Sequence, residues 1–127
     1  MGEEGLAASI LDTGALIAIE RGDERVRAIL QERTGRLVIP SPVLAQVWRD
    51  GARQARLAIV LRSRDTRIDV LDENAAKAAG VLCGRTGTSD IVDASVVISA
   101  RLHHAVVVTS DPDDLRRIDP SIEVESL

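Results

Sequence analysis

Short runs of apolar, mostly β-branched residues alternate along this chain with longer stretches in which apolar residues recur at helical spacing. The run ASIL predicts a buried strand, and TGALIAIERG predicts the helix that follows it and stops at Gly22. The same alternation continues to the end of the chain. The expected strands cover residues 8–11, 36–40, 67–71, 105–110 and 122–125. The expected helices cover residues 13–22, 23–33, 42–50, 52–64, 72–85, 90–104 and 112–118.

Five strands separated by helices are typical of the α/β class, in which helices cover both faces of a parallel sheet. We expect residues 1–127 to form a single domain, because this length suffices for a core and no linker or repeat interrupts the pattern. One cysteine, Cys83, excludes an internal disulfide framework and fits a reducing compartment. We see neither a signal peptide nor a run long enough to cross a membrane, so we expect a cytoplasmic protein.

The charge of the chain is unevenly distributed. The net charge of -4 argues mildly against nucleic-acid binding. Six arginines nevertheless lie between Arg49 and Arg67, against two aspartates, while the other carboxylates cluster elsewhere. The sequence therefore predicts a molecule with separate basic and acidic regions.

Three segments of the chain send aspartates to one predicted edge of the sheet. Asp12 ends the first strand, Asp111 ends the fourth, and Asp90 and Asp93 open the helix that leads into the fourth strand. The carboxyl ends of parallel strands and the starts of the following helices share the edge at which α/β proteins bind ligands. Taken singly, Asp12 and Asp111 fit helix N-caps, and Asp90 and Asp93 fit acids that complement the helix dipole.

Taken together, the aspartates are harder to explain as caps, because like charges that converge repel one another. A hard divalent cation with oxygen ligands, Mg²⁺ or Mn²⁺, would neutralise them. Such a site can activate water and shield the charge of a phosphodiester under attack. We therefore interpret Asp12, Asp90, Asp93 and Asp111 as metal ligands.

Two motifs carry a resemblance to a known family. ILDTGALIAI and DASVVISARLHHAVVVTSD resemble the strand–Asp–helix opening and the Asp–Ala helix and Thr-x-Asp strand end of PIN-domain proteins. These are metal-dependent ribonucleases that include the VapC-type toxins of bacterial toxin–antitoxin pairs. The resemblance implies a three-layer α/β/α sandwich with a five-stranded parallel sheet and one or two Mg²⁺ or Mn²⁺ ions. It also implies endonucleolytic cleavage of RNA, with Asp12, Asp93 and Asp111 as the catalytic acids, a homodimer and a cognate antitoxin.

One position departs from the family pattern. The helix after the second strand normally supplies a glutamate, and IPSPVLAQVWRD places Gln46 there. Glutamine keeps an acceptor oxygen but loses the negative charge, so it can orient a water or bind a metal weakly and cannot act as a carboxylate base. We expect the site to bind metal with lower affinity than it would with glutamate.

Several other residues have two interpretations. Ser110 lies beside Asp111 and is a candidate for orienting a water or a ligand. The arginines of the Gln46 region are expected near the acidic edge, where they are candidates for contacts with RNA phosphates, or else form a solvated face. Trp48 is expected to anchor the core or an interface, with base stacking as the alternative. The three candidate arginines are Arg49, Arg53 and Arg56.

Three functions remain open on this sequence. The first is a metal-dependent endoribonuclease acting as the toxin of a toxin–antitoxin pair. The second is a PIN-fold RNA-binding or regulatory protein whose catalysis is weakened by Gln46; it would bind RNA without cutting it. The third is a signalling receiver domain, which expects an acidic pair early in the chain and a lysine after the last strand, whereas the one lysine here is Lys77.

Overall fold

The computed structural model describes residues 7–127. The expectation that the chain carries no signal peptide concerns mainly residues outside this range. The five strands form one parallel sheet in the order β3-β2-β1-β4-β5. The strands are β1 (Ala8–Leu11), β2 (Arg36–Pro40), β3 (Thr66–Asp69), β4 (Val106–Thr109) and β5 (Val124–Ser126). The predicted α/β class and parallel sheet are confirmed, and this strand order differs from the 2-1-3-4-5 order of receiver domains.

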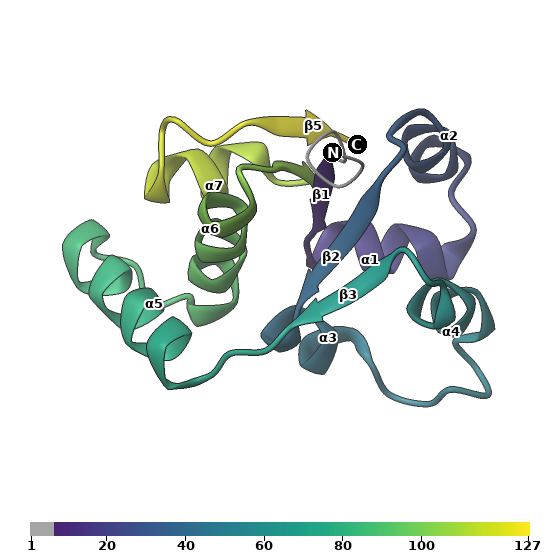
Figure 1. Cartoon of the computed structure of the whole chain (residues 1–127), viewed down its shortest axis with the longest axis horizontal. Coiled ribbons are helices and arrows are strands. Elements are labelled where there is room, and N and C mark those ends of the chain that lie inside the picture. The colour runs from purple at the N-terminus through teal and green to yellow at the C-terminus, as the bar shows by residue number, and fades with distance from the viewer. Residues whose placement is uncertain (1–6) are drawn as a thin grey trace, which may run out of the picture.

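Helices cover both faces of the sheet, as Figure 1 shows: α5, α6 and α7 lie on one side and α1, α2 and α4 on the other. The short helix α3 lies where β2 ends and contacts both α1 and α6. The helices are α1 (Thr13–Arg21), α2 (Glu24–Glu32), α3 (Ser41–Val47), α4 (Ala55–Arg62), α5 (Glu73–Thr86), α6 (Ile91–His103) and α7 (Pro112–Ile118).

The core is aliphatic and lies between the sheet and its two helical layers. Helix α6 is buried over most of its surface, which explains why its sequence is apolar almost throughout. Trp48 packs half-buried against the core, as expected of an anchoring aromatic residue. Fully buried large side chains include Ile10, Leu11, Leu16, Val38, Ile39, Val43, Leu57, Val96, Val97, Val107 and Leu115.

The segment between α3 and α4 was predicted to be mostly helical, and the structure contradicts this. Helix α3 ends at Val47 and α4 begins at Ala55, so the intervening residues form a loop. The buried side chain of Gln54 holds this loop: its Oε1 accepts from the Arg49 and Asp50 amides, and its Nε2 donates to the Val47 carbonyl. These side-chain bonds replace the backbone bonds of a continuous helix.

The two histidines lie at the end of α6 that is remote from Asp93. His103 Nε2 lies 2.8 Å from Asp69 Oδ2 and links this end of α6 to β3. His104 caps the helix in the left-handed conformation, with φ of 50°. None of the helices within residues 7–127 is both long and apolar enough to cross a membrane.

Candidate functional site

Asp12 occupies the centre of the sheet edge at which the strands end. Its backbone follows β1 and donates to the Val108 carbonyl of neighbouring β4, and its carboxylate accepts from the Ala15 amide at 3.0 Å. The predicted N-cap of α1 is therefore confirmed. The side chain is only 6% exposed. Burial raises the pKa of the Asp12 carboxyl, and a hydrogen bond from the Thr109 hydroxyl opposes this rise.

Asp111 lies next to Asp12 across the β1–β4 pair. The buried Thr109 hydroxyl accepts a hydrogen bond from the Asp111 amide at 2.8 Å. Because the same hydroxyl also bonds to the Asp12 carboxylate, this one side chain joins both aspartate-bearing segments. The Asp111 carboxylate makes no capping bond to α7, which corrects the cap interpretation of this residue. Its charge contributes to the raised pKa of Asp12. The carboxylate is exposed and remains available to a ligand.

Asp90 and Asp93 lie one turn apart at the start of α6. The Asp90 carboxylate caps the helix by accepting a hydrogen bond from the Asp93 amide at 3.0 Å. Asp93 is half-buried, and burial together with the charges of Asp90, Asp114 and Asp12 raises its pKa from 3.8 to about 6. The structure thus brings the predicted aspartates into one electrostatic site, and it adds Asp114 from the first turn of α7.

The negative charge of this site has no basic counterpart in the part of the chain that the structure describes. Within residues 7–127, no Lys, Arg or His forms an ion pair with the four predicted aspartates, whereas Asp114 pairs with Arg117 at 3.1 Å. An all-oxygen donor set with uncompensated charge suits a hard divalent cation. No three acidic, His or Cys side chains in the described range could hold a metal ion as they stand. A shared ion therefore requires these side chains to turn toward one another.

Gln46 reaches the site through a contact between α3 and α1. The Thr13 hydroxyl, directly after Asp12, donates to Gln46 Oε1 at 2.8 Å. Both residues lie at the surface, and Gln46 is exposed. Gln46 therefore lies at the rim of the carboxylate site, as the sequence predicted, and its carbonyl oxygen is engaged by Thr13.

Ser110 packs over the first turn of α1. A Cβ atom added to Gly14 would lie 2.0 Å from Ser110 Oγ, so any larger residue here would force the Ser110 side chain to move. The Ser110 hydroxyl consequently lies beside the Asp12 segment, in keeping with its selection as a candidate orienting group.

The three candidate arginines have different surroundings. Arg49 donates to the carbonyls of Ala45 and Trp48, and Arg53 is highly exposed and pairs weakly with Asp50 at 3.9 Å. Arg56 donates to the Glu20 carbonyl near the end of α1. That end is about 12 Å from the Asp12 end, at 1.5 Å per residue. The expectation that Arg56 lies near the acidic edge is therefore wrong.

Sequence reasoning did not select four residues that shape the site. Thr109 stands in the Thr-x-Asp motif already identified, and Thr13 and Gly14 directly follow Asp12, so proximity to the aspartates was the available signal. The signal for Asp114 was its spacing of three from Asp111, which repeats the spacing of Asp90 and Asp93. The four residues are Thr13, Gly14, Thr109 and Asp114.

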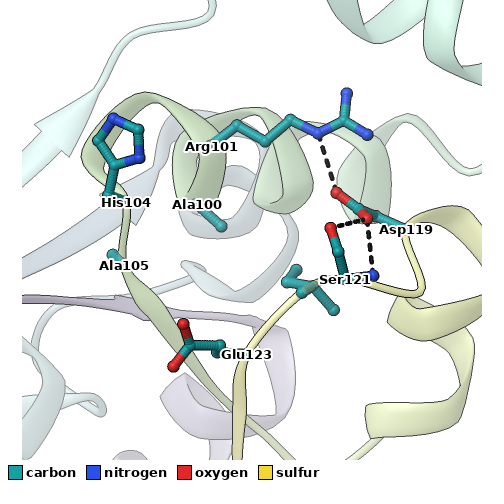
Figure 2. A pocket seen from close by; sticks show the side chains of 8 residues that line it. Ala100, Arg101, His104, Ala105, Asp119, Ser121 and Glu123 are labelled. Carbon is teal, nitrogen blue, oxygen red and sulfur yellow. Dashed lines mark hydrogen bonds and ion pairs between the residues drawn. The ribbon is translucent and has the colours of Figure 1, made fainter.

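Two cavities lie away from these carboxylates. One, of about 210 Å³, lies at the opposite edge of the sheet, before β4 and β5 begin, and Figure 2 shows the Arg101–Asp119–Ser121 network within it. The other, of about 490 Å³, lies among β3, α5 and α6. None of the candidate aspartates lines either cavity. The acidic site therefore lies apart from both cavities.

Comparison with known proteins agrees with this architecture. The model of the PIN domain matches residues 9–120. The chain is similar to VapBC2 of Rickettsia felis, bound to a promoter DNA fragment, at 20% identity and TM-score 0.72, covering 94% of this chain and 98% of that one. It is also similar to DNA-bound VapBC of Salmonella typhimurium, at 25% identity and TM-score 0.69, and the match covers 95% of this chain and 98% of that one. A third similar structure is Mycobacterium tuberculosis VapC20, a toxin that cleaves the sarcin–ricin loop, at 17% identity and TM-score 0.64. That match covers 78% of this chain and 86% of VapC20. No curated protein matches the chain.

Proposed function

Because this chain belongs to the PIN domain family, we propose that it is a metal-dependent endoribonuclease that hydrolyses RNA phosphodiester bonds. The observation that carries this proposal is the cluster of four aspartates from three chain segments that has no basic partner within residues 7–127. Such a cluster is costly unless a cation or a proton neutralises it. The cleavage of the sarcin–ricin loop by VapC20 supports RNA as the substrate class.

In this proposal Asp12, Asp90, Asp93 and Asp111 hold Mg²⁺ or Mn²⁺ after small side-chain rotations. When bound, the ion would help to ionise a water molecule and shield the charge of the phosphodiester. Thr109 keeps the Asp12 and Asp111 segments in register, since its hydroxyl contacts both.

The polar groups at the rim of the site complete the proposed mechanism. In the metal-free site the pKa of Asp93 is raised to about 6, so binding of a cation would favour its ionised form. Ser110 and Gln46 orient water or substrate, and Arg49 and Arg53 bind flanking phosphates, which predicts a salt-dependent affinity for RNA. Because Gln46 brings no charge, Gln46→Glu should raise the affinity for Mn²⁺.

The biological role in this proposal is that of the toxin of a type II toxin–antitoxin pair, acting in the cytoplasm as a homodimer with a cognate antitoxin. The similarity to VapBC proteins of Rickettsia felis and Salmonella typhimurium supports this role. Copurification with the product of an adjacent small gene would test it.

Gln46 favours a second candidate function, a PIN-fold RNA-binding or regulatory protein with weakened catalysis. The two candidate functions differ in whether the protein cleaves RNA. Cleavage can be measured with labelled single-stranded and hairpin RNAs in the presence of Mg²⁺, Mn²⁺ or EDTA. Cutting that requires the metal and disappears in Asp93→Asn, but persists in the exposed control Asp65→Asn, supports the nuclease. Binding without cutting favours the second function, and a protein that neither binds nor cuts RNA contradicts both.

A further inference from the structure

The two ends of the Gln46 carboxamide have different surroundings. The carbonyl end accepts the Thr13 hydroxyl at 2.8 Å. The Nε2 end has no hydrogen-bond partner among residues 7–127, and the side chain is exposed. With the oxygen held by Thr13, the two N–H donors of Gln46 face solvent.

These donors lie at the rim of a site whose ionisable side chains are carboxylates. Thr13 directly follows Asp12, so its bond to Gln46 places the amide at the rim of the carboxylate cluster. Ionised carboxylates offer no hydrogen to an approaching phosphate, and they repel it. An amide N–H does offer one, whereas amide nitrogen is not a ligand for hard cations such as Mg²⁺. A neutral donor at this place therefore suits an anionic oxygen better than it suits the metal.

We infer that Gln46 is a phosphate-binding residue, which donates from Nε2 to a non-bridging oxygen of the RNA backbone while Thr13 fixes the amide by its oxygen. The inference rests on the proposed function, since it presupposes an RNA substrate. It assigns Gln46 a different role from metal or water ligation, and one that a glutamate at this position could not perform, because a carboxylate does not donate.

The test is a binding measurement in which the RNA stays intact. In the Asp93→Asn background with Mg²⁺, the affinity for a labelled single-stranded oligonucleotide is measured by fluorescence anisotropy, with and without Gln46→Met. Methionine keeps the length of the side chain and removes the donors. Loss of one hydrogen bond to a charged group predicts about tenfold weaker binding. Gln31→Met, at an exposed position near the end of α2 and remote from the site, is the matched control and should bind as before.

Two further measurements separate phosphate binding from metal ligation. Single phosphates of the RNA are replaced in turn by neutral methylphosphonates. At one position the replacement should weaken binding to the protein with Gln46 but should not change binding to the Gln46→Met variant. In the otherwise unaltered protein, Gln46→Met should leave the Mn²⁺ affinity, measured by electron paramagnetic resonance, within about twofold, since each tenfold would correspond to about 1.4 kcal/mol of lost ligation.

Each outcome bears on one of the two proposals. If the unaltered protein cuts RNA but Gln46→Met binds it equally well, or weakens Mn²⁺ binding instead, this inference is wrong and the proposed function stands. If the unaltered protein neither binds nor cuts RNA, the proposed function fails and the inference fails with it. Thr13→Val, which releases the amide, should weaken RNA binding less than Gln46→Met, and Thr13→Ser should restore it.

Discussion

Replacing Asp93 by asparagine should stabilise the protein in the absence of divalent metal, even though it should abolish activity. The pKa of this carboxyl rises from 3.8 to about 6, so ionising it costs the folded state free energy. Each pKa unit corresponds to about 1.4 kcal/mol, which gives an upper limit of about 3 kcal/mol. Asp93 is only half-buried, and solvent screening reduces this figure to about 1–2 kcal/mol.

The gain from Asp93→Asn should depend on pH in a defined direction. Because the folded-state pKa is raised, the folded protein binds more protons than the unfolded chain between pH 3.8 and about 6, and its stability falls as the pH rises through this window. Below the window the carboxyl is neutral in both states, so asparagine brings no electrostatic gain. Above it the gain is complete.

The measurement is urea unfolding in EDTA at pH 4.5 and pH 7.5, with Asp65→Asn as the control for loss of one exposed charge. The stabilisation by Asp93→Asn should be larger at pH 7.5 by about 1 kcal/mol. Saturating Mn²⁺ should stabilise the unaltered protein more than the variant, because it binds the folded site. Equal gains at both pH values, or a less stable variant at pH 7.5, would refute the electrostatic reasoning.

Four further predictions concern stability and can be checked by thermal or urea unfolding. Gly14→Ala should cost about 1 kcal/mol through its clash with Ser110, and adding Ser110→Ala should recover part of the loss. Gln54→Ala should cost about 2–4 kcal/mol, because it leaves three loop groups unbonded at a position only 4% exposed. Gly80→Ala should stabilise α5 by about 0.5–1 kcal/mol, since nothing lies within 4 Å of the new methyl group. Gly35→Ala should instead destabilise the protein by more than about 2 kcal/mol, because φ is 113° and the methyl would lie 2.1 Å from the Ala7 carbonyl.

The sheet and the meeting of Asp12 with Asp111 could be predicted from sequence because both follow from rules that act along the chain. A buried strand followed by a helix recurs at each step, and parallel strands all end at one edge. The adjacency of β1 and β4 then brings the two aspartates together. The Asp90–Asp93 pair was accessible from helical spacing alone.

The remaining features depend on contacts between distant segments, which local patterns do not encode. The loop before α4 has a helical pattern, and only the buried bonds of Gln54 show why it is not a helix. Arg56 is close to Gln46 in sequence, yet the packing of α4 on α1 carries it to the far end of α1. The bond between Thr13 and Gln46 likewise depends on how α3 meets α1. Periodicity identifies which face of a helix is buried, but not the neighbour against which it packs.

The central pairing of β1 with β4 also determines when the acidic site can exist. Asp12 and Asp111 are about 100 residues apart, and closing a loop of that length costs about 4 kcal/mol of chain entropy, which only the assembled sheet can offset. A polypeptide still on the ribosome has Asp12 long before it has β4, so the cluster cannot form until both strands have been made. Any fragment that ends before β4 would therefore lack the paired aspartates on which metal binding is proposed to depend.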